Sequence, residues 1–212
     1  GFGNENVFQY IETDSYKKAN LHVSIDASGS MGGEKWNSTL TNVVALCKAV
    51  DMIQNLSIQV TFRTTTNNNP YIVMAYDSKV DKLSKVKQMF PTLHPGGTTP
   101  EGLCFEAIMK NFLGATNDMD SYFLNISDGE PYFGNNDLYY SGEVAYEHTR
   151  KMVKEIEGMG IKILSYFVDQ WVSKGDEPSS GFKRMYGSGA RLIDLTNVSQ
   201  ITKTMNQLFL SK

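Results

Sequence analysis

The stretch "SIDASGSMGG" at residues 24–33 places one acid, Asp26, directly after an apolar run, and two hydroxyl residues, Ser28 and Ser30, follow at alternate positions. We interpret residues 21–25, "LHVSI", as a first strand that ends at this loop. The spacing supplies neither a nucleophile with its base nor an apolar side chain for a core. The three side chains have oxygen in common, which indicates that they converge on a ligand or cap a turn.

Composition limits the classes of protein that this chain can belong to. The 212 residues, 41% hydrophobic and 20% charged, are typical of one globular domain. A formal net charge of −3 argues against a broad nucleic-acid-binding surface. Cys47 and Cys104 fall in helix-like segments, so we expect free thiols and a cytoplasmic, intracellular protein. We find no signal peptide and no apolar run long enough to span a bilayer, and we expect no membrane partner.

Apolar runs of strand length alternate with longer runs of helical periodicity along the chain. The expected strands are 21–25, 57–65, 71–77, 121–127, 161–168 and 190–195, and the expected helices are 36–56, 80–90, 101–113, 143–158, 182–186 and 198–210. This order predicts an α/β fold, a doubly wound and mostly parallel central sheet of about six strands flanked by helices. The polar turn "TNNNP" predicts a hairpin that places one antiparallel strand at an edge. We expect one domain at 21–212 after an N-terminal extension at 1–20.

Two further loops carry polar side chains where ligands gather in such sheets, at the carboxyl ends of the strands. Thr98 and Thr99 follow the glycine pair in "HPGGTTP", and Asp128 follows the predicted strand at 121–127 in "ISDGEP". Together with the first loop they offer two carboxylates and several hydroxyls. Hard oxygen donors of this kind favour Mg²⁺, with Mn²⁺ or Ca²⁺ as substitutes, over zinc or copper.

The segments "DASGS", "GGTTPEG" and "ISDGEP", in this order, resemble the metal-ion-dependent adhesion site (MIDAS) of the von Willebrand factor A (VWA) domain family. The resemblance extends from about Leu21 to about Leu210 and implies that family's Rossmann-like fold. It implies that hydroxyl groups bind the metal directly, that the acids often act through water, and that Thr99 caps the following helix. The metal-site positions that it implies are Asp26, Ser28, Ser30, Thr98 and Asp128.

A finer resemblance rests on "ISDGEP" together with "YSGEVAYEHTRKMVKEIEG", "IKILSYFV", "FKRMYG" and "ITKTMNQLF". These segments are similar to the carboxyl-terminal VWA domain of the cobaltochelatase T-type subunit. The resemblance implies a non-catalytic module of an AAA+ ATPase-associated complex, with the ATPase or its substrate as the protein partner.

Three functions are compatible with these residues. The first is a Mg²⁺-dependent protein-binding module whose metal accepts an acidic residue, Asp or Glu, from a partner. The second is a Mg²⁺-dependent phosphatase or phosphotransferase that uses Asp26 as nucleophile. The third is an assembly domain in which the metal is purely structural. Since the loops with hydroxyls and acids carry no His, Cys or Lys acid–base partner, we predict the binding module and no catalytic residues.

The acidic and aromatic residues near these loops have less specific interpretations. Glu101 is expected to interact with a helix dipole in the first turn, and Glu130 to be a solvated loop acid. The aromatic residues after Asp128 are compatible with local packing and, equally, with the core of an interface. They are Tyr132, Phe133, Tyr139 and Tyr140.

Overall fold

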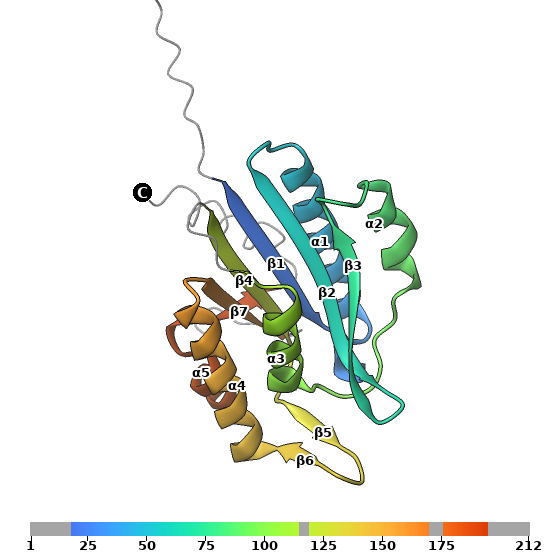
Figure 1. The fold of residues 1–212 in the computed structure, drawn as a ribbon. Coiled ribbons are helices and arrows are strands. Elements are labelled where there is room, and N and C mark those ends of the chain that lie inside the picture. The colour runs from blue at the N-terminus through green and yellow to red at the C-terminus, as the bar shows by residue number, and fades with distance from the viewer. Residues whose placement is uncertain (1–17, 115–118, 170–175, 195–212) are drawn as a thin grey trace, which may run out of the picture.

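A computed structural model describes residues 18–114, 119–169 and 176–194 of the chain. These residues form a central sheet with helices on both faces (Figure 1). The predicted helix at 198–210 and most of the predicted extension at 1–20 lie outside the described residues.

The central sheet of the described residues has six strands in the order β3-β2-β1-β4-β7-β8. Their bounds are β1 (Ala19–Asp26), β2 (Leu56–Thr66), β3 (Asn69–Asp77), β4 (Asp120–Ser127), β7 (Lys162–Asp169) and β8 (Ala190–Asp194). The edge strand β3 runs antiparallel to β2, and every other neighbouring pair is parallel. The predicted sheet with its one antiparallel edge strand is therefore confirmed.

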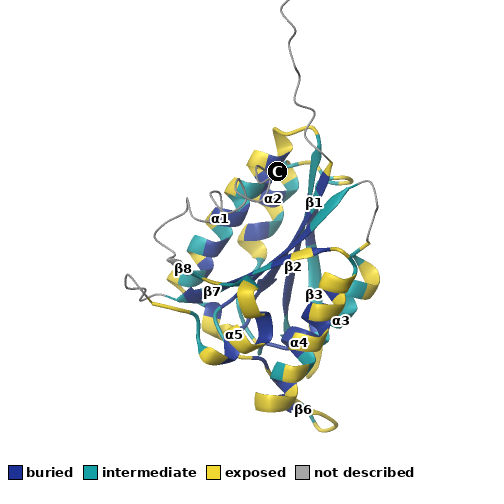
Figure 2. Ribbon diagram, turned by 90° about the vertical axis from the view of Figure 1, so that its left-hand side faces the viewer, coloured by how far each residue is buried: buried dark blue, intermediate teal, exposed yellow. Residues whose placement is uncertain are grey.

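Helices cover both faces of this sheet (Figure 2). They are α1 (Glu34–Asp51), α2 (Ser84–Met89), α3 (Glu101–Asn111), α4 (Gly142–Gly158) and α5 (Ser180–Tyr186), with short 3-10 turns at Gly29–Met31, Phe90–Thr92 and Gly187–Gly189. Val43 of α1 packs in one apolar cluster with Val23 and Ile25, and Phe105 of α3 packs in a second with Phe123 and Phe182. The helices on both faces leave the central strands β1 and β4 buried at nearly every position. Within the described part of the chain, no helix combines the length and hydropathy needed to cross a bilayer.

The segment 128–142, between the predicted strand at 121–127 and the predicted helix at 143–158, contains a short hairpin of β5 (Tyr132–Gly134) and β6 (Tyr139–Ser141) that we did not predict. Asn135 closes its turn, because its Oδ1 accepts hydrogen bonds from the backbone N–H groups of Asp137 at 2.9 Å and Leu138 at 2.8 Å. Strands of three residues are too short to show an alternating pattern, whereas this side-chain-to-backbone turn is a recognised property of asparagine.

Gly102 lies where α3 passes α4, and a side chain there has no room. A Cβ atom would lie 2.5 Å from Oη of Tyr140 and 2.9 Å from both Nδ1 of His148 and Cα of Thr149. We expect Gly102→Ala to lower the free energy of unfolding by about 1–3 kcal/mol in urea titrations, as overpacking does. Gly158→Ala at the end of α4, where a Cβ would meet nothing within 4 Å, is the matched control and should not destabilise. Equal effects of the two substitutions would contradict this packing.

Candidate metal centre

The carboxyl ends of the parallel strands β1 and β4 bring distant loops to one edge of the sheet. Ser28 and Ser30 from the loop after β1, Thr98 from the loop before α3, and Asp128 from the loop after β4 line one hollow of about 360 Å³. The other residues that line it are Gly97, Thr99, Gly129, Glu130 and Tyr132. Four of the five predicted site residues are therefore brought together at one open surface.

The side chains in this hollow form a chain of polar contacts. The hydroxyl oxygens of Ser28 and Ser30 lie 3.1 Å apart, and Ser30 Oγ donates to Asp128 Oδ1 at 2.7 Å. The ammonium of Lys35 donates to the other carboxylate oxygen, Asp128 Oδ2. Both oxygens of Asp128 are thus engaged, one by a hydroxyl and one by a cation.

Asp26, the fifth predicted residue, lies beneath the hollow and is fully buried. Its Oδ1 accepts from the backbone N–H of Ser28 at 2.8 Å, and its Oδ2 accepts from Ser127 Oγ at 2.8 Å and from Thr99 Oγ1 at 3.4 Å. Burial raises the pKa of Asp26 to about 6, although the nearby charge of Arg63 opposes that rise. The carboxylate therefore holds the first loop in place from below.

Gly97 gives the second loop the shape that presents Thr98 to the hollow. Its φ is +72°, and a Cβ there would lie 2.6 Å from the carbonyl oxygen of Thr65, so a side chain at this position would be strained. The backbone N–H of Thr98 donates to Thr65 Oγ1 at 2.9 Å, and the two hydroxyl oxygens are 3.2 Å apart. The expectation that Thr99 caps α3 is wrong: Pro100 occupies the cap position, and the Thr99 hydroxyl points to Asp26 instead.

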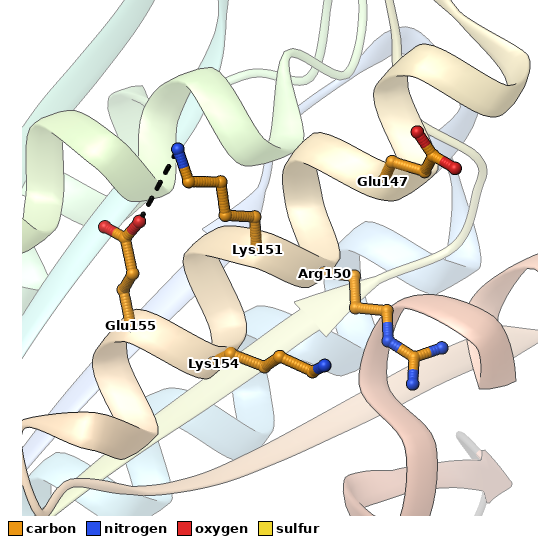
Figure 3. Close-up of a pocket in the computed structure, with 5 residues that line it drawn as sticks. All are labelled: Glu147, Arg150, Lys151, Lys154 and Glu155. Carbon is orange, nitrogen blue, oxygen red and sulfur yellow. Dashed lines mark ion pairs between the residues drawn. The ribbon is translucent and has the colours of Figure 1, made fainter.

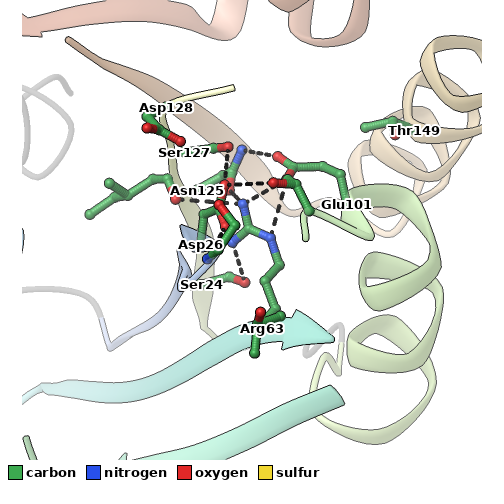
Figure 4. A network of polar contacts seen from close by, with 12 residues as sticks. Ser24, Asp26, Arg63, Glu101, Asn125, Ser127, Asp128 and Thr149 are labelled. Carbon is green, nitrogen blue, oxygen red and sulfur yellow. Dashed lines mark hydrogen bonds and ion pairs between the residues drawn. The ribbon is translucent and has the colours of Figure 1, made fainter. Parts of the chain in front are cut away.

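A buried polar network lies under the site (Figure 4). The register of β1 places Asp26 beside Arg63 of β2 and Ser24 beside Asn125 of β4. The fully buried guanidinium of Arg63 donates to Ser24 Oγ at 3.0 Å and to Asn125 Oδ1 at 2.6 Å. It also donates twice to Glu101 Oε2, at 2.9 and 3.3 Å.

Glu101, at the start of α3, completes this network and is fully buried. Its Oε1 accepts from Asn125 Nδ2 at 3.0 Å and from the hydroxyl of Tyr186 in α5. The expectation that Glu101 serves mainly the helix dipole is therefore wrong, because its charge is paired with Arg63. Burial works against the charge of Arg63, but Glu101 and then Asp26 outweigh it and raise the pKa of the guanidinium. An arginine inside the otherwise uncharged run 57–65 was the sequence signal for this network.

The donor atoms of the hollow fit a hard divalent cation. In the described part of the chain, no group of three or more His, Cys, Asp or Glu could hold a metal, so a cation here would depend on hydroxyl oxygens. The carboxylates of Asp128 and Glu130 line the hollow, Asp26 lies below it, and Asp128 already accepts one cationic group, the Lys35 ammonium. Ser28, Ser30 and Thr98 supply neutral oxygen beside them.

Solved structures share this architecture at low sequence identity. The von Willebrand factor domain of the type V pilus tip protein Mfa5 from Porphyromonas gingivalis superposes with a TM-score of 0.66 at 11% identity, covering 92% of this chain and 97% of that one. The chain has the von Willebrand factor A fold. The pilus adhesin SpaC from Lactobacillus rhamnosus GG (TM-score 0.66, 13% identity) and manganese-loaded TRAP from Plasmodium vivax (TM-score 0.60, 15% identity) are also similar.

These similarities establish the VWA fold alone, since all three identities are low. The SpaC and TRAP matches each cover 92% of this chain, but 30% and 74% of those chains, respectively. The sequence matches no family model and no curated protein.

The aromatic residues beside the hollow of this VWA fold divide into two kinds. Phe133 and Tyr140 are buried and pack with Ala145, so for them the packing interpretation holds. Tyr132 and Tyr139 are 45% and 72% exposed, and their rings meet edge to face with centroids 6.1 Å apart. The exposed pair forms part of the surface that any molecule entering the hollow would meet.

A second hollow of the VWA fold lies on the outer surface of α4 (Figure 3). All its lining side chains are charged, have mixed signs and come from this one helix, and Lys151 and Glu155 approach to 3.8 Å. This pattern is typical of a solvated helix face. It does not resemble a binding site built by several elements.

Proposed function

We propose that this VWA fold is a non-catalytic protein-binding module whose hollow holds Mg²⁺ and accepts the carboxylate of an Asp or Glu from a partner protein. The observation that carries the proposal is the convergence of Ser28, Ser30, Thr98 and Asp128 on one open hollow, with Asp26 fixed below. Proteins with this fold include two pilus proteins and the manganese-loaded TRAP protein. These similarities support a binding function for the present chain.

The hydroxyls of Ser28, Ser30 and Thr98 would hold the ion together with the carboxylate of Asp128, while Asp26 keeps the first loop in position. When bound, Mg²⁺ would supply an electrophilic coordination position for an anionic oxygen. Asp128 and Glu130 line the hollow, and the Lys35 ammonium neutralises part of the charge of Asp128. An open coordination position on the cation would accept an anionic oxygen from outside, which favours an acidic partner.

Phosphoryl transfer through Asp26 is the competing function, and the position of that carboxylate argues against it. A nucleophile must reach its substrate, whereas Asp26 is fully buried and both of its oxygens accept hydrogen bonds. The described residues that line the hollow include no His or Cys to act as acid or base. Hydrolysis of aryl phosphates that disappears in Asp26→Asn would reverse this ranking.

The identity of the acidic partner is a separate proposal. The sequence resemblance to the cobaltochelatase T-type subunit favours an AAA+ ATPase complex or its substrate, inside the cell. A purely structural metal is the alternative, and it would raise the melting temperature of the isolated chain without creating any Mg²⁺-dependent partner.

Thr98→Ala tests the proposal, because it removes one hydroxyl from the hollow and keeps the hydrogen bond from the Thr98 backbone N–H to Thr65 Oγ1 of the sheet. We expect the chain immobilised on resin to retain a protein from cell extract in Mg²⁺ and to release it in EDTA. Thr98→Ala should reduce the retained amount by about tenfold or more, the range seen when metal-site support is removed. Thr66→Ala, at the exposed end of β2, is the control. Equal retention by wild type and Thr98→Ala, or in Mg²⁺ and EDTA, would contradict the proposal.

A further inference from the structure

Lys35 is the second residue of α1, and the fold brings it to the rim of the hollow. Gly33, with φ of +77°, turns the chain immediately before the helix. The Lys35 side chain is 17% exposed, and its ammonium contacts Oδ2 of Asp128, which lies 93 residues further along the chain. A lysine that is mostly buried against a carboxylate differs from Lys48, the exposed lysine in the last turn of the same helix.

Because of this contact, the Lys35 ammonium would lie close to any cation that binds in the hollow and would repel it. The Asp128 side chain is 1% exposed, and its two oxygens are already engaged by Ser30 and Lys35. A divalent cation and an ammonium at the same carboxylate repel each other, and the repulsion is stronger in a partly buried site than in water. Arg63 is the other cation close to the site, but Glu101 neutralises it below the hollow.

We propose that Lys35 is a tethered competing cation that neutralises Asp128 in the metal-free chain and lowers the affinity of the hollow for Mg²⁺. This inference rests on the proposed function, in which a divalent cation binds there. An incoming carboxylate adds the negative charge that Lys35 cancels at Asp128. The metal and the acidic partner should therefore each bind the chain more tightly when the other is bound.

A positioning role for Lys35 makes the opposite prediction. If the ammonium serves to hold Asp128 in a metal-binding orientation, its loss would weaken the binding of divalent cations. The sign of the change in affinity therefore separates the two roles.

The test is Mn²⁺ binding to the full chain, measured at low ionic strength from the electron paramagnetic resonance signal of free Mn²⁺. Lys35→Met should bind Mn²⁺ about tenfold more tightly than wild type, a change of about 1.4 kcal/mol. Lys35→Arg keeps the charge and should bind like wild type. Lys48→Met removes a charge from the far end of α1, about 20 Å away, and should change nothing.

Melting temperatures give a second readout. Without metal, Lys35→Met should melt below wild type because Asp128 loses its ion pair, and Mn²⁺ should raise its melting temperature by more than it raises that of wild type. Unchanged or weaker Mn²⁺ binding by Lys35→Met, while wild type binds, would overturn the inference and leave the proposed function standing. Absence of Mn²⁺ binding in wild type and Lys35→Met would overturn both.

Discussion

Replacing Arg63 with Met is expected to lower the free energy of unfolding by about 3–5 kcal/mol, the usual cost of removing one partner from a buried ion pair. The substitution leaves the fully buried carboxylate of Glu101 without its cation. It also removes the donors that satisfy Ser24 and Asn125. Chemical denaturation followed by far-ultraviolet circular dichroism measures the free energy of unfolding of both proteins.

A second substitution tests the cause of that loss. Adding Glu101→Gln to Arg63→Met removes the unpaired charge but keeps a side chain that can accept from Tyr186, so part of the stability should return. Lys110→Met breaks the exposed pair between Lys110 and Glu106 and should cost less than about 1 kcal/mol. If Arg63→Met were no more harmful than Lys110→Met, the buried network would not stabilise the fold as described.

Asp26→Asn is expected to weaken Mn²⁺ binding by about 100-fold, the upper end of the range for changes around metal ligands. The amide has the size of the carboxylate and can still accept from the backbone N–H of Ser28, so the first loop should keep its shape. The substitution removes the negative charge beneath the hollow and places an amide donor where Oδ2 accepted from Ser127 and Thr99, whose hydroxyl oxygens can accept from it instead. Competition between Mn²⁺ and a fluorescent chelator measures the affinity.

The matched control for this charge is Asp137→Asn, an exposed acid in the turn between β5 and β6. It should bind Mn²⁺ like wild type. Undiminished binding by Asp26→Asn, or an equal loss in Asp137→Asn, would show that Asp26 does not contribute specifically to the site.

The order of strands and helices could be predicted from sequence because burial on both faces leaves a clear pattern. The runs 121–127 and 161–168 are mostly apolar, whereas α1 shows helical periodicity. The hairpin β5–β6 was missed because its strands have three residues each and are closed by a side-chain turn at Asn135.

The candidate site was predictable in its residues but not in its surroundings. Polar side chains at the ends of parallel strands meet for a topological reason, so the loops around Ser28 and Asp128 could be placed together from sequence, whereas Thr98, which precedes α3, was placed with them by the resemblance to the VWA family. The pairing of Arg63 with Glu101 depends on the depth at which α3 packs against the sheet. Lys35 resembles an ordinary solvated charge in the sequence, and only the packed fold brings it to Asp128.

The most direct test of the proposed metal site is a titration of the wild-type chain with Mn²⁺, followed by the longitudinal relaxation rate of water protons. If the hollow holds one cation with an open coordination position, the rate should rise through exchanging water and saturate at one Mn²⁺ per chain. The enhancement should be lost in Thr98→Ala and should fall when an acidic partner displaces the water. A titration without saturable binding, or identical curves for wild type and Thr98→Ala, would contradict the proposed site.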